Sequence, residues 1–261
     1  MDELIRMEKI EILSEGFEII KNMTLNFPRG MSTVIIGPSG CGKSTLLKAA
    51  AGILLPSRGS LFFEGKNFFK MSEEEIKEFR RKNGFVFQDS ALWANRSLYQ
   101  NLSLPLEFHY PDWSEEKRSS KIRILLDKTG LTSQSSLRPA QLSTGEGKIV
   151  SILRALVTDP SLLFLDEPTL SVDTANARII YDMIRDLKNK GCTLITATHD
   201  PGLISWLADY LVALKTGELL AFGPFDEVTK SPNPEVRQIL GSVLMEAASY
   251  DTDILGLLNQ E

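Results

Sequence analysis

The clearest chemistry in this sequence is phosphate binding by a glycine-rich loop that begins at Gly37. The loop reads Gly-Pro-Ser-Gly-Cys-Gly-Lys-Ser and lies between a β-branched apolar run and a helix-forming run. Glycines let backbone N–H groups point towards a phosphate, and the N-terminus of the following helix adds partial positive charge. The pattern therefore predicts a phosphate-binding loop rather than an ordinary glycine-rich turn. The expected contacts are Gly37, Pro38, Ser39, Gly40, Cys41, Gly42, Lys43, Ser44 and Thr45.

Two side chains of this loop have defined roles in the prediction. Lys43 is expected to reach the β- and γ-phosphates as a catalytic cation, and Ser44 is expected to coordinate Mg²⁺. Kinases, GTPases, helicases and transporters all use such a loop, so the loop alone does not identify the process that the bound nucleotide serves.

A pair of carboxylates at the end of an apolar run is the second candidate site. Residues 162–165 read Leu-Leu-Phe-Leu, and Asp166 and Glu167 follow directly. Asp166 is predicted to hold Mg²⁺, directly or through water. Glu167 is predicted to orient or deprotonate an attacking water. The alternative is an ordinary strand end with two solvated acids.

Composition narrows the classes of function. The chain has 261 residues, of which 43% are apolar, and a net charge of −5 with a pI near 5.3. An acidic chain argues against a broad nucleic-acid surface, so no nucleic-acid partner is expected. Cys41 and Cys192 imply neither a disulfide framework nor a zinc site, and we expect both to be packing residues. No secretory signal and no run of roughly 18 apolar residues occurs, so we expect a soluble chain that reaches a membrane through a partner.

The order of apolar runs predicts an α/β fold. Antiparallel strands are expected between residues 10 and 25 and at 59–63, a helix at 71–82, and a buried strand at 84–87. Helical periodicity between residues 89 and 153, interrupted by Pro105, Pro111 and Pro139, predicts an inserted helical subdomain. A strand at 162–165, a helix at 175–189 and a strand at 193–196 form a parallel βαβ unit, and residues 211–222 form a hairpin. The predicted domains are 1–88 and 154–224 as two parts of one core, 89–153 as the helical subdomain, and 225–261 as a C-terminal helical extension.

A segment between the two candidate sites carries a family resemblance. Residues 142–146 read Leu-Ser-Thr-Gly-Glu and run into a helix that ends in Arg154-Ala-Leu. This stretch resembles the ATP-binding-cassette (ABC) ATPases, whose signature segment reads Leu-Ser-Gly-Gly-Gln. Ser143 and Gly145 match the family's γ-phosphate contacts, whereas Thr144 replaces a glycine and Glu146 replaces a glutamine. Taken alone, Ser-x-x-Glu before an apolar helix is a capping box, and the two interpretations are compatible.

Further motifs follow in the order of that family. Gln88 ends its strand, Asp173 closes a Ser-Val-Asp run, and His199 lies in Thr-His-Asp after the next strand. The resemblance covers roughly residues 5 to 225 and implies a P-loop NTPase with a RecA-like core that hydrolyses ATP with Mg²⁺. It implies that Gln88 senses Mg²⁺ and the attacking water, that His199 contacts the γ-phosphate, and that Asp173 lies at a dimer interface.

The same resemblance implies a partner and an adenine contact. In the family, the phosphate loop of one protomer faces the signature segment of another, so one copy of each motif implies a dimer with a second copy of this chain. An aromatic residue usually stacks on adenine upstream of the loop. Phe17 is the nearest candidate, while Ser14 is the alternative occupant of that position and Phe17 is equally compatible with the core.

Two segments are similar to the ATPase subunits of Mla-type, MCE-linked phospholipid transport systems. Residues 87–106 contain Phe-Gln-x-x-Ala-Leu and Asn-x-x-x-Pro-Leu, and residues 233–240 read Asn-Pro-Glu-Val-Arg-Gln-Ile-Leu. The resemblance implies membrane permease subunits as partners, together with an MCE-domain protein and a small regulatory subunit. It implies a location at the cytoplasmic face of the inner membrane, bound through the permease. Trp93, in the first segment, is equally compatible with the core of the helical subdomain.

The C-terminal tail is amphipathic. Its apolar residues are Val236, Ile239, Leu240, Val243 and Leu244 on one helical face, then Ile254, Leu255, Leu257 and Leu258. We hypothesise that it crosses to the other ATPase subunit or binds the regulator, the alternative being packing on its own domain. Two other functions also stay open: an ABC transporter ATPase for another substrate, such as an amino acid, and a soluble non-transport ABC ATPase of the iron–sulfur assembly type.

Overall fold

The computed structural model describes residues 2–250, with side chains up to residue 242. The chain forms two compact units. The first comprises the chain up to Met71 together with the chain from Thr193 onward, and the second is Ser72–Cys192. This division into two units does not test the four-part domain division given above, which stays a prediction.

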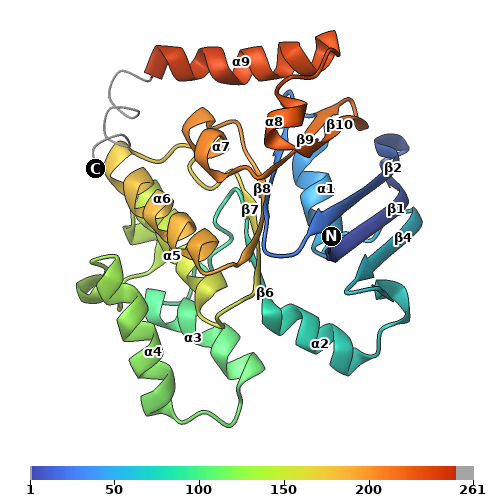
Figure 1. Ribbon diagram of the computed structural model, residues 1–261. Coiled ribbons are helices and arrows are strands. Elements are labelled where there is room, and N and C mark those ends of the chain that lie inside the picture. Colours follow the sequence, from blue (N-terminus) through green and yellow to red (C-terminus); the bar gives the residue numbers. More distant parts are fainter. Residues whose placement is uncertain (1, 251–261) are drawn as a thin grey trace. The chain divides into compact units, whose positions relative to one another are not determined.

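The first unit contains two groups of strands (Figure 1). Strands β1 (Glu3–Ser14), β2 (Phe17–Pro28), β4 (Arg58–Phe63) and β5 (Lys66–Asn67) form an antiparallel sheet in the order β2-β1-β4-β5. In the other group, β3 (Ser32–Ile36) pairs in parallel with both β8 (Thr193–Ala197) and β9 (Tyr210–Lys215), and β10 (Glu218–Pro224) pairs with β9 in the antiparallel sense. All residues of β3 and β8 are buried, as the continuous apolar runs predicted.

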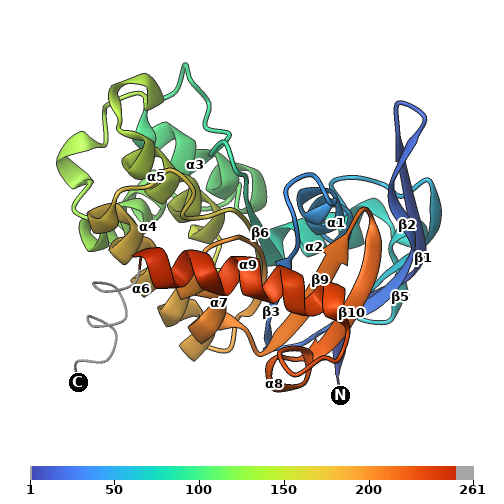
Figure 2. The same ribbon diagram turned by 90° about the horizontal axis from the view of Figure 1, so that it is seen from above.

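The helices of the first unit cover these strands. They are α1 (Lys43–Ala50), the short 3₁₀ helix η1 (Phe68–Lys70), α7 (Pro201–Leu207), α8 (Phe225–Val228) and α9 (Pro234–Tyr250). Helix α9 lies against α7 and β10, as Figures 1 and 2 both show, and it buries Val236, Ile239 and Leu240 there. The alternative of packing on its own domain is therefore correct for this first part of the tail. The side chains of Val243 and Leu244, and all of residues 251–261, lie outside the described part of the chain.

The second unit joins a short parallel pair of strands to a group of helices. Strands β6 (Asn83–Val86) and β7 (Leu162–Asp166) are parallel, with Val86 opposite Leu165. The helices are α2 (Glu73–Lys82), α3 (Leu98–His109), α4 (Glu115–Lys128), α5 (Thr144–Leu156) and α6 (Thr174–Asn189), with the 3₁₀ helices η2 (Thr132–Gln134) and η3 (Pro139–Gln141). Serine side chains cap α2, α3, α4 and α5, and Asp173 caps α6.

One expectation for this region was wrong, and two alternatives that the sequence left open are decided. Helix α3 continues through Pro105, because Leu102 and Leu106 on either side are fully buried and hold the helix in place. Trp93 is 60% exposed, so it is not part of the core. Phe17 is 72% exposed at the start of β2, so it is not a core residue either. The expectation that Cys41 and Cys192 are packing residues is confirmed, because both side chains are buried.

Candidate functional site

The glycine-rich loop joins β3 to α1, which is the strand–loop–helix arrangement that a phosphate-binding loop needs. Gly37, Gly40 and Gly42 have φ values of 153°, 76° and 106°, which residues with a side chain rarely adopt. A Cβ at Gly37 would lie 2.3 Å from the carbonyl oxygen of Leu214, and one at Gly42 would lie 2.9 Å from Cδ1 of Ile20. Neighbouring chain segments therefore require glycine at these two positions.

Gly40 differs from the other two glycines. A Cβ there would meet nothing within 4 Å, so the loop borders open space at this point. Gly42 caps α1 without a side-chain hydrogen bond, which leaves the first N–H groups of the helix without a competing capping side chain. These features fit an anionic phosphate group over the loop.

Lys43 lies inside this loop and contacts His199. Its Nζ donates to the carbonyl oxygens of Gly37 at 2.9 Å and Pro38 at 3.2 Å, and it lies 2.8 Å from Nε2 of His199. Because an ammonium group only donates, His199 accepts through Nε2 and carries its ring proton on Nδ1. The structure thus brings together a lysine and a histidine that were predicted from separate motifs.

Local structure after β8 explains the position of His199. The backbone N–H of Thr198 bonds to Ile35 of β3, and the Thr198 hydroxyl accepts from the N–H of Asp200. Asp200 then caps α7 by accepting from Leu203 at 3.0 Å. The two side chains that flank His199 thus fix a tight strand-to-helix turn, and His199 lies at its centre.

In the second unit, Gln88 and Glu167 emerge at the same edge of the parallel pair. Each follows by two residues the opposed positions Val86 and Leu165. Asp166, at the end of β7, is 2% exposed and Glu167 is 8% exposed, whereas Gln88 is exposed. The φ angle of Glu167 is 46°, a left-handed conformation that a non-glycine residue adopts only when its surroundings enforce it. The carboxylates are therefore held rather than freely solvated, as the solvated-acid alternative would have them.

The signature segment, residues 142–146, forms the N-terminus of α5. Ser143 accepts from the N–H of Glu146 at 3.2 Å, and Glu146 accepts from the N–H of Ser143 at 2.8 Å, so the predicted capping box is present. Gln134 donates a further hydrogen bond to Glu146 at 3.0 Å. The hydrogen bond from the Ser143 backbone, followed by that from Gln134, holds the pKa of Glu146 below its ordinary value. Glu146 therefore carries a negative charge at neutral pH.

Gly145 has a packing role that the sequence did not reveal. A Cβ there would lie 2.6 Å from Nδ2 of Asn176 on α6. Asn176 is itself bound to Asp173, the N-cap of α6, through an Nδ2 to Oδ2 hydrogen bond of 2.6 Å. A glycine at this position is what lets the N-termini of α5 and α6 approach each other.

One buried cation of this unit was missed by the sequence interpretation. Lys148 on α5 is 1% exposed and donates to the carbonyl oxygens of Phe87 and Gln88. The available indication was its place on the apolar face of α5, three residues after Gly145 and four before Ile152, where an uncompensated charge is costly.

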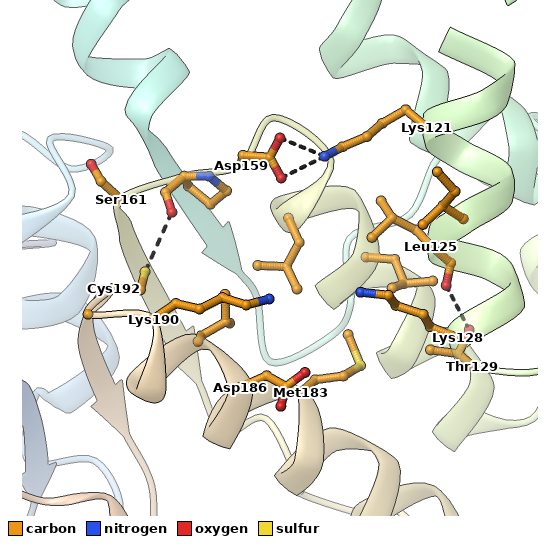
Figure 3. A pocket seen from close by; sticks show the side chains of 16 residues that line it. Lys121, Leu125, Lys128, Thr129, Asp159, Ser161, Met183, Asp186, Lys190 and Cys192 are labelled. Carbon is orange, nitrogen blue, oxygen red and sulfur yellow. Dashed lines mark hydrogen bonds and ion pairs between the residues drawn. The ribbon is translucent and has the colours of Figure 1, made fainter. Parts of the chain in front are cut away.

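A surface pocket of about 410 Å³ contains none of the predicted site residues. It lies in the second unit between α4, α6 and the C-terminal end of α5. Figure 3 shows Lys121 paired with Asp159 at one side and Lys128 and Lys190 directed towards each other across the opening. Cys192, at another side of it, donates to Pro160.

A family model described as ABC transporter matches residues 20–170, a stretch that contains the glycine-rich loop, the signature segment and the two carboxylates. The chain belongs to the ABC transporter family. As a member of this family it is an ABC ATPase that binds ATP with Mg²⁺ and hydrolyses it. The predictions of an α/β ABC ATPase fold, of ATP hydrolysis and of ATP with Mg²⁺ are thereby confirmed.

The comparisons include one relative matched over nearly its whole length. The intermembrane phospholipid transport ATP-binding protein MlaF of Escherichia coli is 28% identical over 260 residues, which cover 97% of this chain and 96% of MlaF. The methionine import ATP-binding protein MetN of Mannheimia succiniciproducens is 31% identical over 89% of this chain and 69% of its own length. The dimeric ATP-binding cassette MJ0796, solved with ADP and Pi in a post-hydrolysis state, has 28% identity and a TM-score of 0.77 over 84% of this chain and 98% of its own.

The described residues are compatible with a Mg²⁺ ion that is held mainly by the nucleotide. They contain no group of three or more His, Cys, Asp or Glu side chains placed to hold a metal ion. Mg²⁺ in nucleotide sites is held by one or two protein ligands together with the phosphates, so a hydroxyl such as Ser44 and one carboxylate suffice.

Between residues 2 and 250, no helix has the length and hydropathy needed to cross a membrane.

Proposed function

We propose that this chain is the energy-coupling ATPase subunit of a membrane transporter that moves phospholipid, similar to the Mla-type systems. The observation that carries the proposal is the length of the match to MlaF, which extends over 97% of this chain. That match includes the C-terminal segment 233–240, which forms the start of α9. The match to the methionine import protein covers 89% of this chain and 69% of that protein.

Nucleotide binding is assigned to the glycine-rich loop. Its backbone N–H groups and the start of α1 would hold the phosphates, with Pro38, Ser39, Cys41 and Thr45 shaping the loop around them. Lys43, already held next to His199 in the loop, would turn to the β- and γ-phosphates. His199 would contact the γ-phosphate from the end of β8.

Hydrolysis is assigned to the carboxylate edge of the second unit. Glu167, held in a left-handed backbone conformation, would orient and deprotonate the attacking water, and the amide of Gln88 at the same edge would help to position it. Ser44, Asp166 and Gln88 would hold Mg²⁺. Mg²⁺, when bound, supplies positive charge that neutralises the phosphate oxygens as they develop negative charge.

The signature segment is assigned to the nucleotide of a second copy of this chain. Ser143 and Gly145 lie at the N-terminus of α5, where a hydroxyl and backbone N–H groups favour an anion. Binding of ATP would close the dimer, and loss of the γ-phosphate contacts would reopen it. Permease subunits would receive this motion at the cytoplasmic face of the inner membrane, with an MCE-domain protein and a small regulatory subunit as further partners.

Transport of methionine or a related amino acid is the second candidate, because the methionine importer has the higher identity, 31% against 28%. Both candidates share the same ATPase chemistry. They differ in the permease and in the molecule that is carried.

The experiment is to isolate the chain from native membranes with its partners and to identify the bound chains and lipids. ATP hydrolysis is measured in parallel for the wild type and for Glu167→Gln, with an expected loss in kcat of at least about 100-fold for the variant. A permease, an MCE-domain protein and bound phospholipid support the proposal. Recovery with a permease and an amino-acid-binding protein supports the second candidate, and active turnover with no membrane partner refutes transport.

A further inference from the structure

The buried ammonium group of Lys148 connects the helix of the signature segment to the loop that carries Gln88. Nζ of Lys148 donates to the carbonyl oxygen of Gln88 at 2.6 Å and to that of Phe87 at 3.2 Å. Its side chain is one of the largest that are fully buried in the protein. A buried ammonium group persists only where other polar groups replace its water, and here backbone carbonyls of one loop do so.

A second cation of α5 holds the next part of the same loop. Arg154 donates to the carbonyl oxygens of Ala91 at 2.7 Å and Ser90 at 3.3 Å. Ser90 and Ala91 have φ angles of 64° and 45°, so this loop has two consecutive residues in the left-handed region. Such a backbone conformation needs support from its surroundings.

Three acidic groups attract the ammonium group of Lys148, one from the Gln88 loop and two from the end of β7. Burial lowers the pKa of Lys148, and the nearby carboxylates of Asp166, Asp89 and Glu167 oppose that decrease. The ammonium group thus donates hydrogen bonds to the loop of Gln88 and is also attracted to the carboxylates at the end of β7. The hydrogen bonds of Lys148 go to this loop, and neither goes to the glycine-rich loop or to the signature segment.

We propose that Lys148 is a positioning residue that fastens the Gln88 loop to the signature helix, so that the two move as one piece during ATP hydrolysis. The inference rests on the proposed role of Gln88 at Mg²⁺ and the attacking water. Because the bonds go to backbone carbonyls, a movement of α5 carries the loop with it. Lys148 thereby acts on hydrolysis through Gln88 and not through the nucleotide.

The test uses Lys148→Met, which keeps an unbranched side chain of similar length but cannot donate, and Lys148→Arg, which can. Lys128→Met, at an exposed position on α4, is the matched control. Amide hydrogen exchange of residues 87–91 is measured in the ligand-free protein, and kcat and KM for MgATP are measured in the complex with its partners. Lys148→Met is expected to exchange at least tenfold faster in this segment and to lose at least tenfold in kcat, with KM within twofold. Lys148→Arg and the control are expected to stay within threefold of the wild type.

Unchanged exchange in a folded Lys148→Met protein, or faster exchange with wild-type kcat, would overturn the inference. If Lys148→Met does not fold, Lys148→Arg decides: values near the wild type support the inference and a tenfold loss refutes it. When Glu167→Gln abolishes turnover but Lys148→Met does not, only this inference fails. A wild-type complex without ATP hydrolysis refutes the proposed function instead, and the exchange measurement still decides whether Lys148 holds the loop.

Discussion

At the scale of single residues, the site depends on side chains whose surroundings fix them in place. Lys43 and His199 are 2.8 Å apart, and Glu167 adopts a backbone conformation that a non-glycine residue does not take by preference. Glu146 replaces the family's glutamine, yet it makes both hydrogen bonds of a capping box. The replacement therefore changes the charge of the signature segment and keeps its capping box.

Substitution of His199 by alanine is expected to lower kcat by about 100-fold, because it removes the partner of Lys43 and the proposed γ-phosphate contact. Affinity for nucleotide, measured with a fluorescent ATP analogue, is expected to change only a few-fold. His109, the other histidine of the chain, provides the control, and His109→Ala is expected to keep its kcat. Wild-type turnover in His199→Ala would remove His199 from the proposed mechanism.

The change Glu146→Gln is expected to strengthen ATP-dependent dimerisation. Glutamine preserves the capping box and removes a negative charge that would lie near the phosphates of the partner's nucleotide in the proposed dimer, an effect of about 1 kcal/mol, roughly fivefold. Light scattering in the Glu167→Gln background measures it, with Glu146→Ala as the variant that loses both the charge and the cap. A weaker dimer in Glu146→Gln would show that the carboxylate itself is needed.

At the scale of elements, α5 and α6 set the geometry of the signature segment. Ser143 caps α5, Asp173 caps α6, and Gly145 lets the two N-termini meet at Asn176. Helix α2 is stabilised by charges at its own ends, because three acidic residues lie in its first turn and three basic residues lie in its last turn.

A methyl group at Gly145 is expected to destabilise the protein by about 1–3 kcal/mol, since it would overlap Asn176 and push α5 away from α6. Urea denaturation measures this loss for Gly145→Ala. The double variant Gly145→Ala with Asn176→Ala is expected to recover part of it, because the amide that clashes is gone. Gly147→Ala is the control, since a Cβ there meets nothing within 4 Å.

A pH-dependent contribution to stability is expected from Glu78 on α2. Its hydrogen bonds with Arg81 lower its pKa from the ordinary 4.5 to about 2. A lowered folded-state pKa stabilises the fold above about pH 4.5, and this contribution disappears as the pH falls towards 2. The pair is partly exposed, so Glu78→Gln is expected to cost at most about 1 kcal/mol at pH 7. Urea titrations from pH 7 to 2 should show the two proteins converging, and a constant difference would refute the assignment.

At the scale of the whole molecule, the single chain contains one copy of each motif of an ABC ATPase. Unit one holds the glycine-rich loop and His199, and unit two holds the carboxylates and the signature segment. Transport also needs surfaces for a second copy and for a permease. Exposed Trp93, in the segment that resembles the Mla-type coupling region, is available for such a surface.

Helix α9 is expected to stabilise the first unit independently of nucleotide binding. Leu240 is 7% exposed, and Leu240→Ala is expected to lower the free energy of unfolding by about 2–3 kcal/mol while MgATP affinity is unchanged. Thermal denaturation and nucleotide titration measure the two quantities. Ile124→Ala, at a residue that is 52% exposed, should cost less than about 0.5 kcal/mol. An unchanged stability in Leu240→Ala would contradict the structural role of α9.

The sequence by itself determined the α/β class, the phosphate loop and the order of the motifs, because these depend on local patterns of glycine, apolar and capping residues. It could not predict that α3 passes through Pro105, that Phe17 and Trp93 are exposed, or that Gly145 packs on Asn176, since each depends on neighbours distant in the chain. The contact of Lys43 with His199 and the hydrogen bonds of buried Lys148 to the Gln88 loop likewise depend on residues distant in the chain. Only the tertiary structure decided them, because burial and hydrogen-bond partners are properties of packed elements and not of a sequence pattern.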